Sequence, residues 1–122
     1  MITQAQAFRI AARQTDLNFS PGEAFGYSNT GYLFLAEIVE RVSGTSLAEF
    51  ATDRIFVPLG MERTHFSTNH ESLVPDRADS YERKDGEYRR QKLNFSIYGG
   101  TSLMTTTEDL TRWSRNFSDP TV

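Results

Sequence analysis

Apolar residues recur along much of the chain with the spacing of helices rather than strands. After Gly31 they return every three or four positions, and only Glu37, Glu40 and Arg41 leave a narrow polar stripe. This pattern predicts a largely buried helix that ends at Gly44, because glycine readily takes the left-handed conformation of a helix C-cap. The recurring positions are Tyr32, Leu35, Ala36, Val39 and Val42.

Two further helix starts carry a capping box, in which a hydroxyl residue and the residue three positions later satisfy each other's backbone N–H groups. Thr3 stands three residues before Gln6, and Ser46 stands three before Glu49. Each box therefore predicts the start of a helix, and the apolar positions of the first helix suit an amphipathic one. The expected helix ends are Gln14 for the first and Arg54 for the second.

The carboxyl-terminal part predicts one more capped helix. Thr106 precedes Asp109 by three residues, and Leu110, Trp113 and Phe117 follow at the spacing of one helix face. Packing in the core is the first expectation for the two aromatic residues, and an aromatic binding platform is the alternative.

Residues 80–92 change to a strand pattern. The stretches SYER and EYRRQK lie on either side of an Asp85-Gly86 pair, and Asp-Gly is a strong signal for a hairpin turn. We expect a short, exposed hairpin with Arg89 and Arg90 on a solvated strand face.

The apolar stretch IFVPLGM, residues 55–61, contains Pro58 and Gly60, which favour a turn packed on the core rather than a helix. Taken together, the elements predict a mainly α fold with one short β-hairpin. A length of 122 residues suits a single domain that covers residues 1–122.

Composition and charge exclude several classes of function. The formal net charge is -3 and the arginines are scattered, so no basic stripe exists for a phosphate backbone and we expect no nucleic-acid partner. No apolar run reaches the roughly 18 residues of a membrane span, and the amino terminus lacks the pattern of a signal peptide. The compartment stays open.

The residues that could carry metal or nucleophile chemistry are few. The absence of cysteine excludes disulfides and thiolate zinc sites. His65 and His70 lie in polar stretches without the spacing of a metal-binding pair, so we expect both to be solvated and expect neither a metal nor a cofactor. Ser28 is one glycine short of a nucleophile elbow, because Thr30 replaces the second glycine, which argues against a Ser28-histidine-aspartate hydrolase.

Three stretches occur in the order FSPGEAFGYSNTGYLFLAEIVERVSGTSLAEF, IFVPLGMERTHF and GGTSLMTTTEDLTRW. Together they closely resemble the middle of the serine beta-lactamase-like and penicillin-binding-protein family, which groups class C beta-lactamases, D-alanyl-D-alanine carboxypeptidases and related esterases. The resemblance covers about Thr3 to Asn116 and implies the helical subdomain of the beta-lactamase/transpeptidase-like fold. It departs at GGTSL, residues 99–103, where many relatives have a more glycine-rich stretch.

Enzymes of this family combine a Ser-x-x-Lys, a Tyr-x-Asn loop and a Lys-Thr-Gly or similar triplet, and this sequence contains the second alone. Its two lysines are Lys84 and Lys92, with Tyr81 and Arg89 three residues before them, and neither lysine is followed by Thr-Gly. The resemblance therefore implies a fragment of a larger serine hydrolase domain that is inactive by itself.

The resemblance also implies roles for the Tyr-Ser-Asn loop. Tyr27 would be the base or proton shuttle beside the nucleophilic serine, Asn29 would orient the substrate amide and the active-site lysine, and Ser28 would shape the loop. Tyrosine titrates at about 10, so its anion needs nearby cations at neutral pH. In the family these cations are lysines of the two missing elements.

A structural interpretation of the same loop is that Ser28 or Asn29 caps the following helix and Tyr27 packs over its first turn. The substrate of a complete enzyme would be a small amide or ester, namely a beta-lactam, a peptidoglycan peptide or a simple ester. The alternative function is a non-catalytic binding or assembly module. Because an isolated subdomain would expose apolar surface, we expect self-association as a dimer, with domain swapping as one route.

Overall fold

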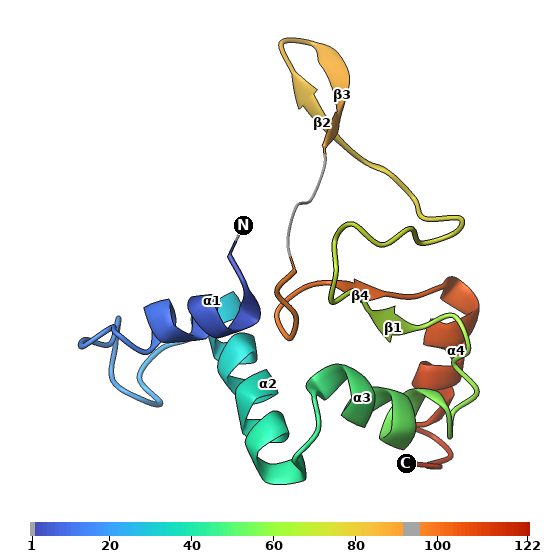
Figure 1. Cartoon of the computed structure of the whole chain (residues 1–122), viewed down its shortest axis with the longest axis horizontal. Helices are drawn as coiled ribbons and strands as arrows, with labels where there is room; N and C mark the ends of the chain where they lie inside the picture. The colour runs from blue at the N-terminus through green and yellow to red at the C-terminus, as the bar shows by residue number, and fades with distance from the viewer. Residues whose placement is uncertain (1, 92–95) are drawn as a thin grey trace.

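The computed structural model describes residues 2–91 and 96–122. In this part of the chain lie four α-helices, one π-helical turn and two small antiparallel sheets (Figure 1). None of these described helices is long and apolar enough to cross a membrane. The helices are α1 (Gln4–Ala11), α2 (Asn29–Ser43), α3 (Leu47–Ala51), η1 (Thr52–Phe56) and α4 (Thr107–Arg115). The strands are β1 (His65–Phe66), β2 (Ser80–Lys84), β3 (Glu87–Gln91) and β4 (Leu103–Met104).

Local hydrogen bonds start the helices where the sequence predicts. Both capping boxes are present. The Thr3 hydroxyl accepts from the Gln6 amide and the Ser46 hydroxyl accepts from the Glu49 amide. In return, the side chains of Gln6 and Glu49 accept from the backbone amides of Thr3 and Ser46. Gly44 ends α2 with a φ of 76°, the left-handed C-cap expected at that position.

The stretch 55–61 is helical at its start, so the prediction of a turn is wrong for its first two residues, which close η1. The helix that Ser46 caps runs from Leu47 through η1 to Phe56, two residues before Pro58, whose ring lacks an amide hydrogen. Phe56 and Met61 then pack with Ala51 in a buried apolar cluster, which is the core position expected for this stretch.

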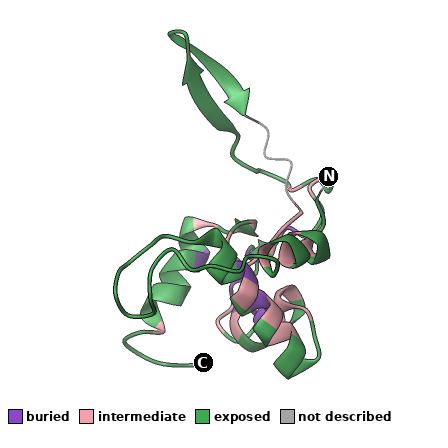
Figure 2. Cartoon of the chain, turned by 90° about the vertical axis from the view of Figure 1, so that its left-hand side faces the viewer, coloured by how far each residue is buried: buried purple, intermediate pink, exposed green. Residues whose placement is uncertain are grey.

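α2 has the predicted length, but the prediction that it is largely buried is wrong. Of its 15 described residues, Leu33 and Ala36 are the buried ones (Figure 2). α1 covers one side of α2 through an edge-to-face contact of Phe8 with Phe34, whose ring centres lie 5.2 Å apart. The predicted helical spacing of α2 is right, but the spacing of apolar residues does not say how many neighbouring elements cover the helix. Its large exposed apolar residues are Tyr32, Leu35, Ile38 and Val42.

α4 begins at the predicted cap, where the Thr106 hydroxyl accepts from the Asp109 amide at 3.2 Å. The prediction that Trp113 and Phe117 pack in the core is wrong. Trp113 is 37% and Phe117 is 74% exposed, and their rings meet edge to face at 5.4 Å. The residue that α4 buries is Asp109, which is 1% exposed.

The carboxylate of Asp109 joins α4 to the segment before β1. It accepts hydrogen bonds from the Arg63 amide and the Thr64 hydroxyl, each at 2.8 Å, and from the Arg112 side chain. Burial by itself raises the pKa of Asp109, but these hydrogen bonds outweigh burial and hold the pKa below its ordinary value. Asp109 is therefore a charged anchor of the fold.

β2 and β3 form the predicted hairpin, which is exposed on both faces and projects away from the helices (Figure 1). Asp85 and Gly86 turn the chain with φ values of 55° and 86°, the left-handed geometry of a two-residue hairpin turn. In β3, Arg90 forms an ion pair with Asp79. Lys92, the expected end of the hairpin, lies outside the described residues.

A second antiparallel pair, β1 with β4, was not predicted. It places His65 opposite Met104 and Phe66 opposite Leu103. Each strand has two residues, which is too short for an alternating pattern to be recognised in a sequence.

Candidate functional site

The Tyr-Ser-Asn segment forms the entrance to α2. Ser28 is the N-cap, with an extended backbone, and its hydroxyl accepts from the Gly31 amide at 3.0 Å. Asn29 is the first helical residue. Of the two expected caps the chain uses Ser28, because its short side chain reaches an amide that the first helical turn leaves without a partner.

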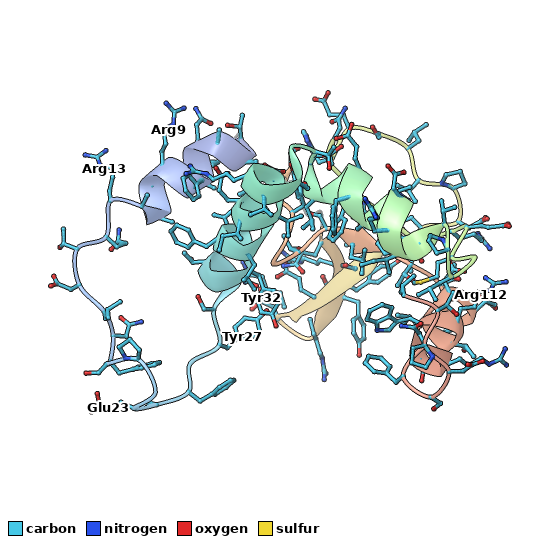
Figure 3. The ribbon with its side chains drawn as sticks, turned by 90° about the horizontal axis from the view of Figure 1, so that it is seen from below. Arg9, Arg13, Glu23, Tyr27, Tyr32 and Arg112 are labelled. Carbon is cyan, nitrogen blue, oxygen red and sulfur yellow. The ribbon has the colours of Figure 1, made fainter. Side chains whose placement is uncertain are left out.

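Tyr27 lies on the loop that leads into α2, at the amino-terminal end of the helix (Figure 3). Its side chain is 79% exposed, so the prediction that Tyr27 packs over the first turn is wrong. The hydroxyl of Tyr27 donates to Oδ1 of Asn29 at 2.9 Å. The two residues singled out from the sequence are therefore brought into direct contact at the surface.

Two glycines bring a distant segment against this loop. A Cβ atom on Gly100 would lie 2.8 Å from the Asn29 carbonyl oxygen and 3.1 Å from Asn29 Oδ1. Gly99 has a φ of 104°, and a Cβ there would lie 2.7 Å from the Tyr32 carbonyl oxygen. No side chain fits at either position without a shift of the backbone, so Gly-Gly is what permits this close approach.

A cavity of about 460 Å³ adjoins the loop on the side of α1. Asn29 and Gly100 contribute to its wall. The rest of the wall is largely apolar and comes from α1, α2 and the segment before Gly99. These apolar residues are Ala7, Ile10, Ala11, Leu33 and Ile97.

The segment that carries the two glycines is held by Tyr98. The Tyr98 hydroxyl donates to Oε1 of Glu40 in α2 at 2.6 Å, and the Gln4 side chain in α1 binds the Tyr98 backbone. Burial, then the hydrogen bond to the Glu40 carboxylate, raises the pKa of Tyr98 well above its usual range. Tyr98 therefore stays protonated at neutral pH as a structural donor. Nothing in the sequence pattern singled it out.

The described residues bring no lysine to Tyr27. Lys84 ends β2 at the tip of the projecting hairpin, away from α2 (Figure 1). Lys92 lies outside the described residues. The recorded partner of the Tyr27 hydroxyl within the described part of the chain is the neutral amide of Asn29.

The Ser28 hydroxyl accepts a hydrogen bond from the Gly31 amide, and within the described residues neither His65 nor His70 is hydrogen-bonded to it. His65 is exposed in β1, as expected of a solvated residue. His70 is not solvated: its side chain is 19% exposed and its Nδ1 lies 3.0 Å from Ser96 Oγ, so that prediction is wrong. Residues 2–91 and 96–122 contain no group of three potential metal ligands.

Comparison with protein-family models matches residues 3–121 to the family described as Beta-lactamase. Penicillin-binding protein 4* of Bacillus subtilis (strain 168) is 46% identical over 63 residues, which cover 52% of this chain and 14% of that protein. Protein flp of Staphylococcus aureus (strain MW2) is 36% identical over 101 residues, which cover 80% of this chain and 20% of that protein.

A solved structure, that of the octameric penicillin-binding protein homologue from Pyrococcus abyssi, shares the fold with a TM-score of 0.80 and 29% identity. The superposition covers 96% of this chain and 27% of that one. The chain thus spans a minor part of each of these relatives. The family match covers residues 3–121 of this chain, which is nearly its whole length, and we conclude that the chain belongs to the beta-lactamase family.

Proposed function

We propose that this chain is the middle segment of a serine hydrolase of the beta-lactamase and penicillin-binding type. Such an enzyme would transfer an acyl group from a small amide or ester substrate to a serine and then to water. The observation that carries the proposal is the contact of Tyr27 Oη with Asn29 Oδ1 at 2.9 Å, on an exposed loop beside an apolar cavity.

The contact divides the chemistry between the two side chains. The Tyr27 hydroxyl is exposed, so a serine hydroxyl from another segment can approach it, and once Tyr27 has lost its own proton the tyrosinate oxygen can take the proton of the serine. The Tyr27 hydroxyl donates to Oδ1 of Asn29. The two Nδ2 hydrogens of the same amide therefore remain available as donors for a substrate carbonyl. Asn29 would in this way orient both the tyrosine and the substrate.

We further propose that the chain is a fragment of a larger hydrolase domain and does not catalyse the reaction alone. Its residues include neither Ser-x-x-Lys nor Lys-Thr-Gly, so the nucleophile and the cations that would favour a tyrosinate are not supplied. The purified chain should show no mass increase after incubation with a fluorescent penicillin or an activated ester. A stoichiometric covalent adduct in the intact mass would overturn this proposal.

The role of Tyr27 is tested in a longer product of the same reading frame that includes Ser-x-x-Lys upstream. That product should be acylated at its serine, and Tyr27→Phe should lower kcat about 100-fold or more. Tyr32→Phe is the matched control, because this neighbouring tyrosine is also exposed but lies inside α2. Equal effects of the two substitutions would contradict the proposed role.

A second candidate is a non-catalytic binding or assembly module, which the exposed apolar side of α2 favours. Leu35, Ile38 and Val42 recur at helical spacing along α2, and the solved relative from Pyrococcus abyssi is an octamer. The flanking coding sequence separates the two functions. An upstream Ser-x-x-Lys and a downstream Lys-Thr-Gly in frame indicate the hydrolase, whereas stop codons at both ends indicate the module.

A further inference from the structure

A cavity smaller than the one beside Asn29 lies next to Thr101 and Ser102, which follow Gly99 and Gly100 in the chain. Its volume is about 190 Å³, and it forms between the segment that follows β1 and the segment that leads into β4. Leu103 and Met104 form an apolar part of its wall, and five polar residues line the rest. These are Ser67, His70, Arg77, Thr101 and Ser102.

Ser67 places a hydroxyl at this cavity that the fold does not use. The residue is 8% exposed, and its backbone amide donates to the Ser102 carbonyl at 2.8 Å. Within residues 2–91 and 96–122 no hydrogen bond joins its side chain to another residue, and its oxygen is not fully buried, so the hydroxyl is open to a hydrogen-bond partner in the cavity. A ligand atom in the cavity would provide that partner.

His70 adds an imidazole ring to the wall of the cavity. Its Nδ1 atom contacts Ser96 Oγ at 3.0 Å, and this contact orients the ring. A serine hydroxyl that donates to Nδ1 leaves the proton of a neutral imidazole on Nε2. Glu71 Oε1 lies 3.9 Å from Nε2, beyond hydrogen-bond reach, and the Glu71 side chain is 79% exposed. Solvent therefore screens the nearest acidic group.

Arg77 supplies the positive charge. Its neighbour Asp76 is paired with Arg63 at 3.2 Å, so that carboxylate is engaged elsewhere. No ion pair of Arg77 is recorded in the described part of the chain, whereas Arg41, Arg63, Arg90 and Arg112 each have one. A guanidinium group offers donors in a planar fork that matches the oxygens of a carboxylate or a phosphate.

We propose that this cavity binds a small oxyanion, a carboxylate or a phosphate. Arg77 pairs with the charge, and Ser67, Thr101 and His70 Nε2 donate hydrogen bonds to its oxygens. Ser102 shapes the wall and does not donate, because its hydroxyl already donates to the Ile97 carbonyl at 2.7 Å. The site uses none of the atoms assigned to Tyr27 and Asn29, so it does not depend on the proposed acyl transfer.

The test is a two-dimensional NMR titration of the ¹⁵N-labelled chain with inorganic phosphate and, separately, with acetate, at constant pH and ionic strength. Binding should give saturable shifts of the backbone amides of Ser67, Thr101 and Ser102. The anion that saturates at the lower concentration identifies the ligand class. Shifts that grow linearly with either salt, without saturation, would overturn the proposal.

Substitutions assign the binding to these side chains. Arg77→Gln should raise the dissociation constant about tenfold or more, and Ser67→Ala should raise it less, because a charged donor contributes more than a neutral one. Arg115→Gln, which removes an arginine of α4 outside the cavity, should leave the constant unchanged. Equal effects of Arg77→Gln and Arg115→Gln would show binding by net charge alone and would contradict the site.

Discussion

The side-chain amide of Gln4 forms two hydrogen bonds with the backbone of Tyr98. Gln4 Oε1 accepts from the Tyr98 amide at 3.0 Å, and Gln4 Nε2 donates to the Tyr98 carbonyl at 3.1 Å. These bonds tie α1 to the segment whose next residues, Gly99 and Gly100, pack on α2 beside Asn29. The position of the candidate site therefore depends on a residue near the start of the chain.

Replacement of Gln4 should destabilise the fold through this pair of bonds. Gln4→Ala leaves two partly buried backbone groups of Tyr98 without partners, so we expect the free energy of unfolding to fall by about 1–3 kcal/mol. Urea denaturation followed by circular dichroism measures the change. Gln91→Ala, in the exposed strand β3, is the matched control and should change the free energy by less than about 0.5 kcal/mol.

A methyl group at Gly100 should disturb the loop that carries Asn29. The added Cβ would meet backbone atoms rather than a flexible side chain, so Gly100→Ala should cost about 1–3 kcal/mol. Gly31→Ala is the control, because its nearest contact would be an ordinary 3.6 Å and alanine favours the helix. Thermal unfolding should show a lower Tm for Gly100→Ala alone; an equal loss in both variants would contradict the close approach.

The N-cap of α2 can be tested without touching Tyr27 or Asn29. Ser28→Ala removes the acceptor for the Gly31 amide and should cost about 1 kcal/mol, whereas Ser28→Asp keeps an acceptor and should retain most of the stability. Chemical denaturation of both variants measures this. Loss of the same stability in Ser28→Asp would show that the hydroxyl does more than cap the helix.

The pKa of Asp109 makes stability depend on pH. Because that pKa is lowered in the folded chain, the stabilisation by the carboxylate is fully present above about 3.9, the pKa of an unfolded aspartate, and is lost as pH falls through the lower folded value. Asp109→Asn should cost about 3 kcal/mol at pH 7. Its difference from the unsubstituted chain should shrink below pH 4 in denaturation curves.

Asp119→Asn serves as the control for this pH dependence, since Asp119 is exposed near the carboxyl end. This variant should follow the unsubstituted chain at every pH. A constant difference between Asp109→Asn and the unsubstituted chain from pH 7 to pH 2 would show that the charge of Asp109 does not contribute.

The exposed apolar side of α2 should drive self-association. Leu35 and Ile38 are each 54% exposed, and burying such side chains against a second copy removes apolar surface from water. Light scattering of the isolated chain should give a dimer mass, and Leu35→Glu should shift it to a monomer. Leu73→Glu, at an exposed leucine outside α2, should leave the dimer intact. A monomer mass at all concentrations would contradict this prediction.

Residues close in the chain specify the parts of this structure that could be predicted. The Thr3 and Ser46 caps act across three residues, and the turn at Asp85 and Gly86 follows from their left-handed backbone. The Tyr-x-Asn loop could also be located in advance, because its family resemblance is carried by a contiguous motif. In each case the residues that form the hydrogen bonds or the motif lie within a few positions of one another in the chain.

Contacts between distant segments decided the rest. Which side of α2 is covered depends on where α1 and Gly99 meet it, so helical spacing alone overestimated its burial. α4 buries a charged residue, Asp109, because donors from the Arg63 segment come within 2.8 Å of its carboxylate. The partner of His70 likewise lies far along the chain, at Ser96. Local periodicity encodes which side chains share a face, and packing determines what that face meets.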